Sequence, residues 1–202
     1  KSLTAACGVD ALTHCIEAYT VQLHQPITDA LALKGISMIA ENLEKAYENG
    51  EDREARRNMM IASTIGGMAF ISSNVGAVHA FAETVGAWFD TPHGVANSLF
   101  LPYIMEFNIP ACPERFADIA DAMGIEREES MSDEQYALKA VEYVKALNRK
   151  LNIPTIKEIK GITEERFEAI AERSANNVLS NDNARKITKE DYLELLKKAY
   201  NE

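Results

Sequence analysis

Three of the four histidines in the chain sit among small and apolar residues, and an acidic side chain accompanies two of them. Asp10 and His14 are four residues apart, a spacing that puts both side chains on one face of a helix with their Cβ atoms roughly 6 Å apart. That separation suits two ligands of one metal ion. A plain Asp–His contact on a helix surface would have the same spacing, so this pair alone leaves both interpretations open.

A second cluster of similar chemistry follows along the chain. His79 and Glu83 are also four residues apart, so they share a helical face. Ten residues after Glu83, His93 lies between Pro92 and Gly94, and we expect these neighbours to fix the shape of a turn. A histidine held in such a turn can point back at a neighbouring helix. The alternative for His93 taken alone is an imidazole that caps a helix or satisfies a polar group in the core.

The two clusters together favour a metal site. One carboxylate and three imidazoles, from Asp10, His14, His79 and His93, form a nitrogen and oxygen donor set suited to Fe(II) or Zn(II). Their surroundings are apolar and weakly charged, whereas a solvated helix face would carry Lys and Glu. His24 lies between two glutamines near a predicted helix end, so we interpret it as an ordinary surface residue.

The elements that must position these residues are all predicted to be helices, which makes the fold class all-α, a multi-helix bundle. Apolar periodicity predicts helices over residues 4–19, with an early interruption at Gly8, and over 26–47, 52–71, 77–88, 95–107 and 113–123. Further helices should begin at caps on Ser132, Thr163 and Thr188, the last two ending near residues 174 and 199. The small residues Gly66 and Gly67 should allow close approach of a neighbouring element. The acidic stretch 126–134 is interpreted as a solvated connection.

Composition narrows the possible partners. The formal charge is −10 and the basic side chains are scattered, which argues against nucleic acid and anionic membranes as partners. No apolar run approaches the ~18 residues of a membrane span. The three cysteines, Cys7, Cys15 and Cys112, form no CxxC pair, so we expect a reducing, cytoplasmic setting and no thiolate zinc site. No glycine-rich nucleotide-binding motif is present.

Several segments resemble, in order and spacing, the C-terminal domain of the iron-dependent (group III) alcohol dehydrogenases. The resemblance covers essentially the whole chain. It is carried by GVDALTHCIEAY, PITDALAL, NMMIASTIGGMAF, VHAFAETVG and DTPHGVANSLFLPYIMEFN, and by a tail in which Asn183, Ala184 and Arg185 precede ITKEDYLELLKKAY.

The resemblance implies roles for individual residues. Family members hold the metal with an Asp and a His four residues apart, a His on a second helix and a His in a Pro-His-Gly turn, which correspond here to Asp10, His14, His79 and His93. An aromatic residue beside the nicotinamide and substrate corresponds to Phe70, for which simple core filling is the alternative. The implied reaction passes hydride between a small alcohol or aldehyde and NAD or NADP, with Fe(II), or Zn(II) as the alternative, as Lewis acid.

The sequence departs from the family pattern at two positions. Many members carry a histidine near the nicotinamide where this chain has Glu83, so the proton-relay role of that histidine cannot be transferred directly. Our hypothesis is that Glu83 accepts the proton or touches the metal, and the alternative is that it only orients a ligand histidine. Ala184 stands where proline is usual, which affects only the local shape of the loop.

Two other classes of protein are compatible with the same residues. A zinc glycerol dehydrogenase or a dehydroquinate synthase would share the fold but typically uses three protein ligands. A non-catalytic metal-binding helical module would have a closed site without an open coordination position. We expect residues 1–202 to form a single helical metal-binding domain that lacks the N-terminal NAD(P)-binding α/β domain of the family. Such a fragment should be inactive alone, and the full-length enzyme should be a homo-oligomer.

Overall fold

The computed structural model describes residues 1–202 and consists of helices, turns and short 3₁₀ segments without a strand. The all-α class predicted from apolar periodicity is therefore confirmed. The α-helices are α1 (Ser2–Thr20), α2 (Pro26–Glu48), α3 (Arg53–Ser73), α4 (Ala77–Phe89), α5 (His93–Asn108), α6 (Pro113–Ala122), α7 (Asp133–Lys150), α8 (Phe167–Ala175) and α9 (Lys189–Asn201).

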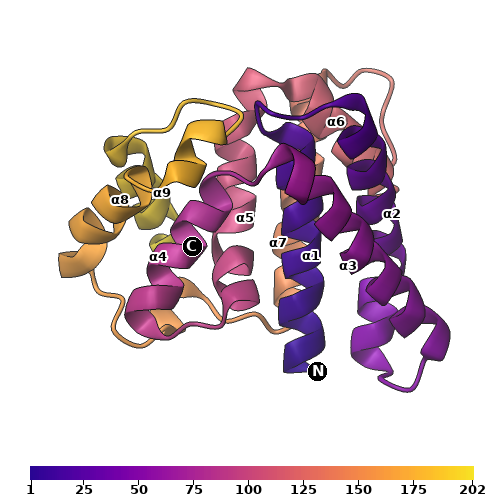
Figure 1. Ribbon diagram of the computed structural model, residues 1–202, viewed down its shortest axis with the longest axis horizontal. Coiled ribbons are helices and arrows are strands. Elements are labelled where there is room, and N and C mark those ends of the chain that lie inside the picture. The colour runs from indigo at the N-terminus through magenta and orange to yellow at the C-terminus, as the bar shows by residue number, and fades with distance from the viewer.

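Helix α1 lies near the middle of the bundle (Figure 1). It packs against α2 and α3 on one side and against α5 on the other, while α4 packs against α5 and α8. Helices α6 and α7 pair with each other, as do α8 and α9. The buried apolar side chains form one continuous cluster of 49 residues, so all these helices contribute to a shared core.

Several helices begin where their capping residues predict. Ser132 and Thr188 each accept a hydrogen bond from the third residue of α7 and α9, and the side chain of that residue accepts from the cap in return. Thr163 makes no such side-chain bond. The chain after it forms the 3₁₀ turn Glu164–Arg166 before α8 begins at Phe167. The acidic stretch lies mainly in the connection between α6 and α7, as expected.

Two local predictions are wrong. Gly8 does not interrupt α1, which is continuous, and a Cβ atom at this position would collide with the side chain of Leu43 on α2. The glycine therefore serves close helix packing. His93 is not in a turn but is the first residue of α5, because the carbonyl of Pro92 already accepts a helical hydrogen bond from Ala96 at 3.0 Å.

Close approach between helices occurs at particular glycines. A Cβ atom at Gly66 would lie 3.1 Å from Cys15 Sγ and 3.4 Å from the carbonyl oxygen of Ala11, which confirms the expected contact of α3 with α1. The same atom at Gly67 would meet nothing within 4 Å. At Gly94 it would collide with the backbone of Ala6, so α5 lies very close to α1 just after His93.

None of the helices has by itself the length and hydropathy needed to cross a membrane. Helices α3 and α4 meet the criterion only when taken together, and they are bent by 105° at the break between them.

We predict opposite effects for alanine at two glycines. Gly94→Ala should lower the free energy of unfolding by about 1–3 kcal/mol, because the added methyl group must displace the backbone of α1. Gly67→Ala should raise it by roughly 0.5–1 kcal/mol, because it improves helix propensity in α3 without a steric conflict. Urea unfolding followed by circular dichroism measures both, and equal effects would contradict the described packing of α5 on α1.

Candidate metal centre

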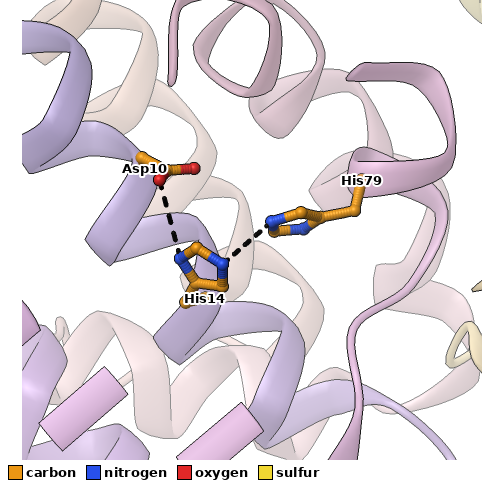
Figure 2. Close-up of side chains that lie close together, drawn as sticks. All are labelled: Asp10, His14 and His79. Carbon is orange, nitrogen blue, oxygen red and sulfur yellow. Dashed lines mark hydrogen bonds and ion pairs between the residues drawn. The ribbon is translucent and has the colours of Figure 1, made fainter. Parts of the chain in front are cut away.

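Three of the predicted ligands come together from two helices (Figure 2). Asp10 and His14 project from α1, and His79 reaches toward them from the first turn of α4. One carboxylate oxygen and one nitrogen from each imidazole lie within 4.8 Å of one another. The structure thus brings together residues that are 65 positions apart in the sequence.

The donor atoms of the cluster lie close to one another. The Nε2 atoms of His14 and His79 are 3.1 Å apart, and Asp10 Oδ2 is 3.9 Å from His14 Nδ1. The side chain of His79 is only 5% exposed, whereas those of Asp10 and His14 are 24% and 19% exposed. The cluster therefore lies at a partly open surface, where a small molecule could reach it from one side.

His93 lies beside this group rather than within it. Its Nε2 is 3.7 Å from Asp10 Oδ1, its side chain is 48% exposed, and its ring centroid is 5.2 Å from that of His79. The amide of Asn97, one turn further along α5, joins the two parts of the site. Asn97 Nδ2 donates to Asp10 Oδ1 at 2.6 Å and lies 3.1 Å from His93 Nε2 and 3.2 Å from His79 Nε2.

Phe70 and Glu83 lie at different places around the cluster. The ring of Phe70, near the end of α3, stacks on His14 with centroids 4.4 Å apart and planes 25° from parallel. Glu83 is exposed one turn after His79, and its Oε2 accepts a hydrogen bond from Asn177 Nδ2 at 2.6 Å. His24 is exposed and contacts Asp29, which agrees with its interpretation as a surface residue.

Burial and neighbouring charges shift the two facing imidazoles in opposite directions. Burial, reinforced by His79, lowers the pKa of His14, which favours the neutral ring with a free lone pair. Burial also acts to lower the pKa of His79, but the hydrogen bond and the negative charge of Glu17 outweigh it, so the pKa of His79 is raised. The cluster thus combines a neutral imidazole with one that carries an Nδ1 proton toward a carboxylate.

Sequence reasoning missed two residues of the site. Glu17, which is 3% exposed, places Oε2 2.5 Å from His79 Nδ1, so this carboxylate is in the position to orient a ligand histidine that was considered as the alternative for Glu83. Asn97 is fully buried, and its Oδ1 has no hydrogen-bond partner. Both could have been found from spacing, because Glu17 is three residues after His14 and Asn97 is four after His93, each a polar position in an apolar helix.

Fold and site together define an all-helical domain with a carboxylate–imidazole cluster of the kind that can hold a metal ion. Residues 4–200 match the sequence model of the Fe-containing alcohol dehydrogenase family, C-terminal. The chain belongs to this family, which confirms the resemblance seen in its motifs.

Individual relatives agree with this assignment. The chain is 43% identical to alcohol dehydrogenase 4 of Saccharomyces cerevisiae and 40% identical to 1,3-propanediol dehydrogenase of Citrobacter freundii, matching 98% of its own length and 51% of theirs. Its structure is similar to that of an alcohol dehydrogenase from Oenococcus oeni, with a TM-score of 0.94 and 40% identity over 98% of this chain and 51% of that one. The chain therefore spans about half the length of the relatives it matches.

The three cysteines lie outside the cluster of Asp10, His14 and His79, and two of them are buried. Their reactivity toward a thiol reagent tests this burial. Burial raises the pKa of the Cys15 thiol to about 12, and burial together with Glu114 raises that of Cys112 to about 11, so both stay protonated near neutral pH. We predict that a thiol reagent at pH 8 modifies the exposed Cys7 rapidly and the other two only after unfolding. Mass spectrometry of the labelled native chain measures this. Rapid labelling of Cys15 would contradict the tight contact of α1 with Gly35 and Gly66.

Proposed function

We propose that this chain binds one divalent metal ion through Asp10, His14, His79 and His93, and that it is the metal-binding part of an NAD(P)-linked alcohol dehydrogenase. The observation that supports this most directly is the convergence of donor atoms from α1 and α4 within 4.8 Å of one another. His93 adjoins the group through Asp10. Because the relatives are twice as long, the activity is proposed for the protein that contains these residues.

The donor set fits the proposed ion. Imidazole nitrogen and carboxylate oxygen suit Fe(II) and Zn(II), and the family description supports Fe(II) as the resident ion, with Zn(II) as its main competitor. The ion pairs of Asp10 involve only histidines, so no Lys or Arg occupies the place of a cation. When bound, the ion would supply Lewis-acid chemistry toward an alcohol or carbonyl oxygen.

The remaining side chains can position the organic reactants. Phe70 presents an aromatic ring beside His14, and we propose that it packs against the nicotinamide or the substrate. Glu83 is exposed one turn beyond His79, and we propose that its carboxylate accepts the proton released from the alcohol. Relatives named for propanediol, butanol and lactaldehyde support a small alcohol or aldehyde as the substrate class.

Association with further protein is also part of the proposal. Met60, Met68 and Ile71 are 71%, 55% and 80% exposed, and all three lie on α3. Exposed apolar side chains gathered on one helix are typical of a surface that another chain or domain covers. We therefore propose that the active protein is a homo-oligomer in which residues 1–202 form the metal-binding unit. Its three cysteines are free, which is typical of a reducing compartment, so we propose the cytoplasm as its location.

Metal content tests the ligand assignment. After anaerobic loading with Fe(II), and separately with Zn(II), elemental analysis of the purified chain should find about one ion per chain. Asp10→Ala and His79→Ala should each abolish stoichiometric binding, because each removes one of the four proposed protein ligands.

His24→Ala is the matched control, since it removes a histidine that contacts only Asp29 at the surface. It should retain the metal. Circular dichroism establishes that each variant is folded before its metal content is compared. A folded Asp10→Ala or His79→Ala chain that keeps a full complement of metal would refute the proposed site.

Glu83→Gln tests the proposed proton acceptor in the active enzyme. The amide cannot take up a proton, so kcat for alcohol oxidation should fall by about 10²-fold, at the lower end of general-base effects because the group is exposed. Metal content should not change. Glu194→Gln, at an exposed position on α9, is the charge control. An unchanged kcat in Glu83→Gln would rule out the role.

A further inference from the structure

We propose that Glu17 is a positioning residue of the metal centre, which holds His79 in the one orientation and tautomer that direct its Nε2 toward the other ligands. The inference rests on the proposed metal site and extends it to a residue outside the ligand set. It is carried by the contacts of one buried carboxylate with the start of α4.

Both oxygens of Glu17 are used by consecutive residues of α4. Oε2 lies 2.5 Å from His79 Nδ1, and Oε1 accepts a hydrogen bond from the backbone N–H of Val78 at 2.8 Å. A carboxylate has no proton to give, so Nδ1 of His79 must be the donor. In the neutral ring, which is the form that can ligate a metal, the proton is thereby fixed on Nδ1 and the lone pair is left on Nε2.

The free nitrogen points into the cluster. His79 Nε2 is 3.1 Å from His14 Nε2 and 3.2 Å from Asn97 Nδ2. Histidines that ligate metals almost always donate their other ring N–H to a carboxylate or carbonyl, which orients the ring and makes the ligand nitrogen more basic. Glu17 is the carboxylate that accepts this N–H from His79, although Glu17 lies on α1 and His79 on α4.

Glu17 also fixes the place where α4 begins. The backbone N–H of Ala77, which precedes the N–H of Val78 that donates to Glu17, donates a hydrogen bond to Asn183 Oδ1 at 3.3 Å. A Cβ atom at Gly76 would lie 3.1 Å from this Asn183 oxygen and 3.2 Å from Glu17 Oε1, so the two oxygens crowd the end of the helix. His79 is therefore held both through its ring and through the first turn that carries its backbone.

Charge provides an independent reason for this assignment. Glu17 is 3% exposed, and His79 is the only basic side chain within ion-pair distance of its carboxylate. Burying a carboxylate is costly unless a positive charge compensates it. Together with Asp10 it brings two negative charges to the cluster, which is the number that one divalent cation balances.

The test compares the zinc affinity of Glu17→Gln with that of the wild-type chain and of Glu142→Gln, an exposed position on α7 that loses the same charge. Dissociation constants come from competition with a chelating dye. Glutamine has nearly the same shape but can accept only one of the two hydrogen bonds, so we expect zinc binding about 10–100-fold weaker in Glu17→Gln and unchanged in Glu142→Gln.

Nitrogen-15 NMR of the imidazoles reports which ring nitrogen of His79 is protonated, a property that would not depend on Glu17 if its role were only structural. In the zinc-loaded wild-type chain, His79 should be protonated on Nδ1 and bound through Nε2. In Glu17→Gln its Nδ1 proton should exchange faster with water. If Glu17→Gln does not fold, the wild-type spectrum still decides, because zinc bound through Nδ1 of His79 would overturn the inference.

The outcomes separate this inference from the proposed function. A wild-type chain without affinity for zinc or iron would overturn the metal site, and the role of Glu17 with it. A wild-type chain that binds zinc, together with a folded Glu17→Gln chain of equal affinity, would overturn the role of Glu17 and leave the site intact.

Discussion

Helix α1 is buried along most of its length, yet one of its faces carries Asp10, His14 and Glu17. A helix that is enclosed on nearly all sides can keep polar groups only if each finds a partner across the packing interface. The partners come from α4 and α5, which must therefore approach at fixed distances and in a fixed register. The arrangement of the site follows from the need to give each of these polar side chains a hydrogen-bond or ion-pair partner.

The close approach needs small residues at specific places. Gly94 lets the start of α5 lie against the backbone of Ala6, and Gly66 lets α3 pass beside Cys15. These contacts bring His93 near Asp10 and place Phe70, one turn after Gly66, on the ring of His14. Glycine matters here because a methyl group would meet the backbone of Ala6 at Gly94 and crowd Cys15 at Gly66.

A buried amide network extends the control of the site to the C-terminal part of the chain. Asn183 and Asn108 exchange hydrogen bonds at 2.7 and 3.0 Å, and both side chains are nearly inaccessible. Asn183 also accepts a hydrogen bond from the N–H of Ala77, the first residue of α4. The segment after α8 therefore helps to fix the first turn of α4, which carries His79. Buried networks of this kind favour one arrangement strongly, since any other leaves a polar group unpaired.

The sequence by itself determined the helical class, most helix starts and the residue types of the cluster, because periodicity, capping residues and spacing of four are local properties of the chain. It also indicated the family through motifs that the comparisons confirm. Only the tertiary structure decided that Glu17 rather than Glu83 contacts His79, that Gly8 packs against Leu43 without ending a helix, and that Asn97 links Asp10 to His93. Spacing fixes the face of one helix that a side chain occupies, but not the neighbouring helix that it meets, since this depends on how distant segments pack.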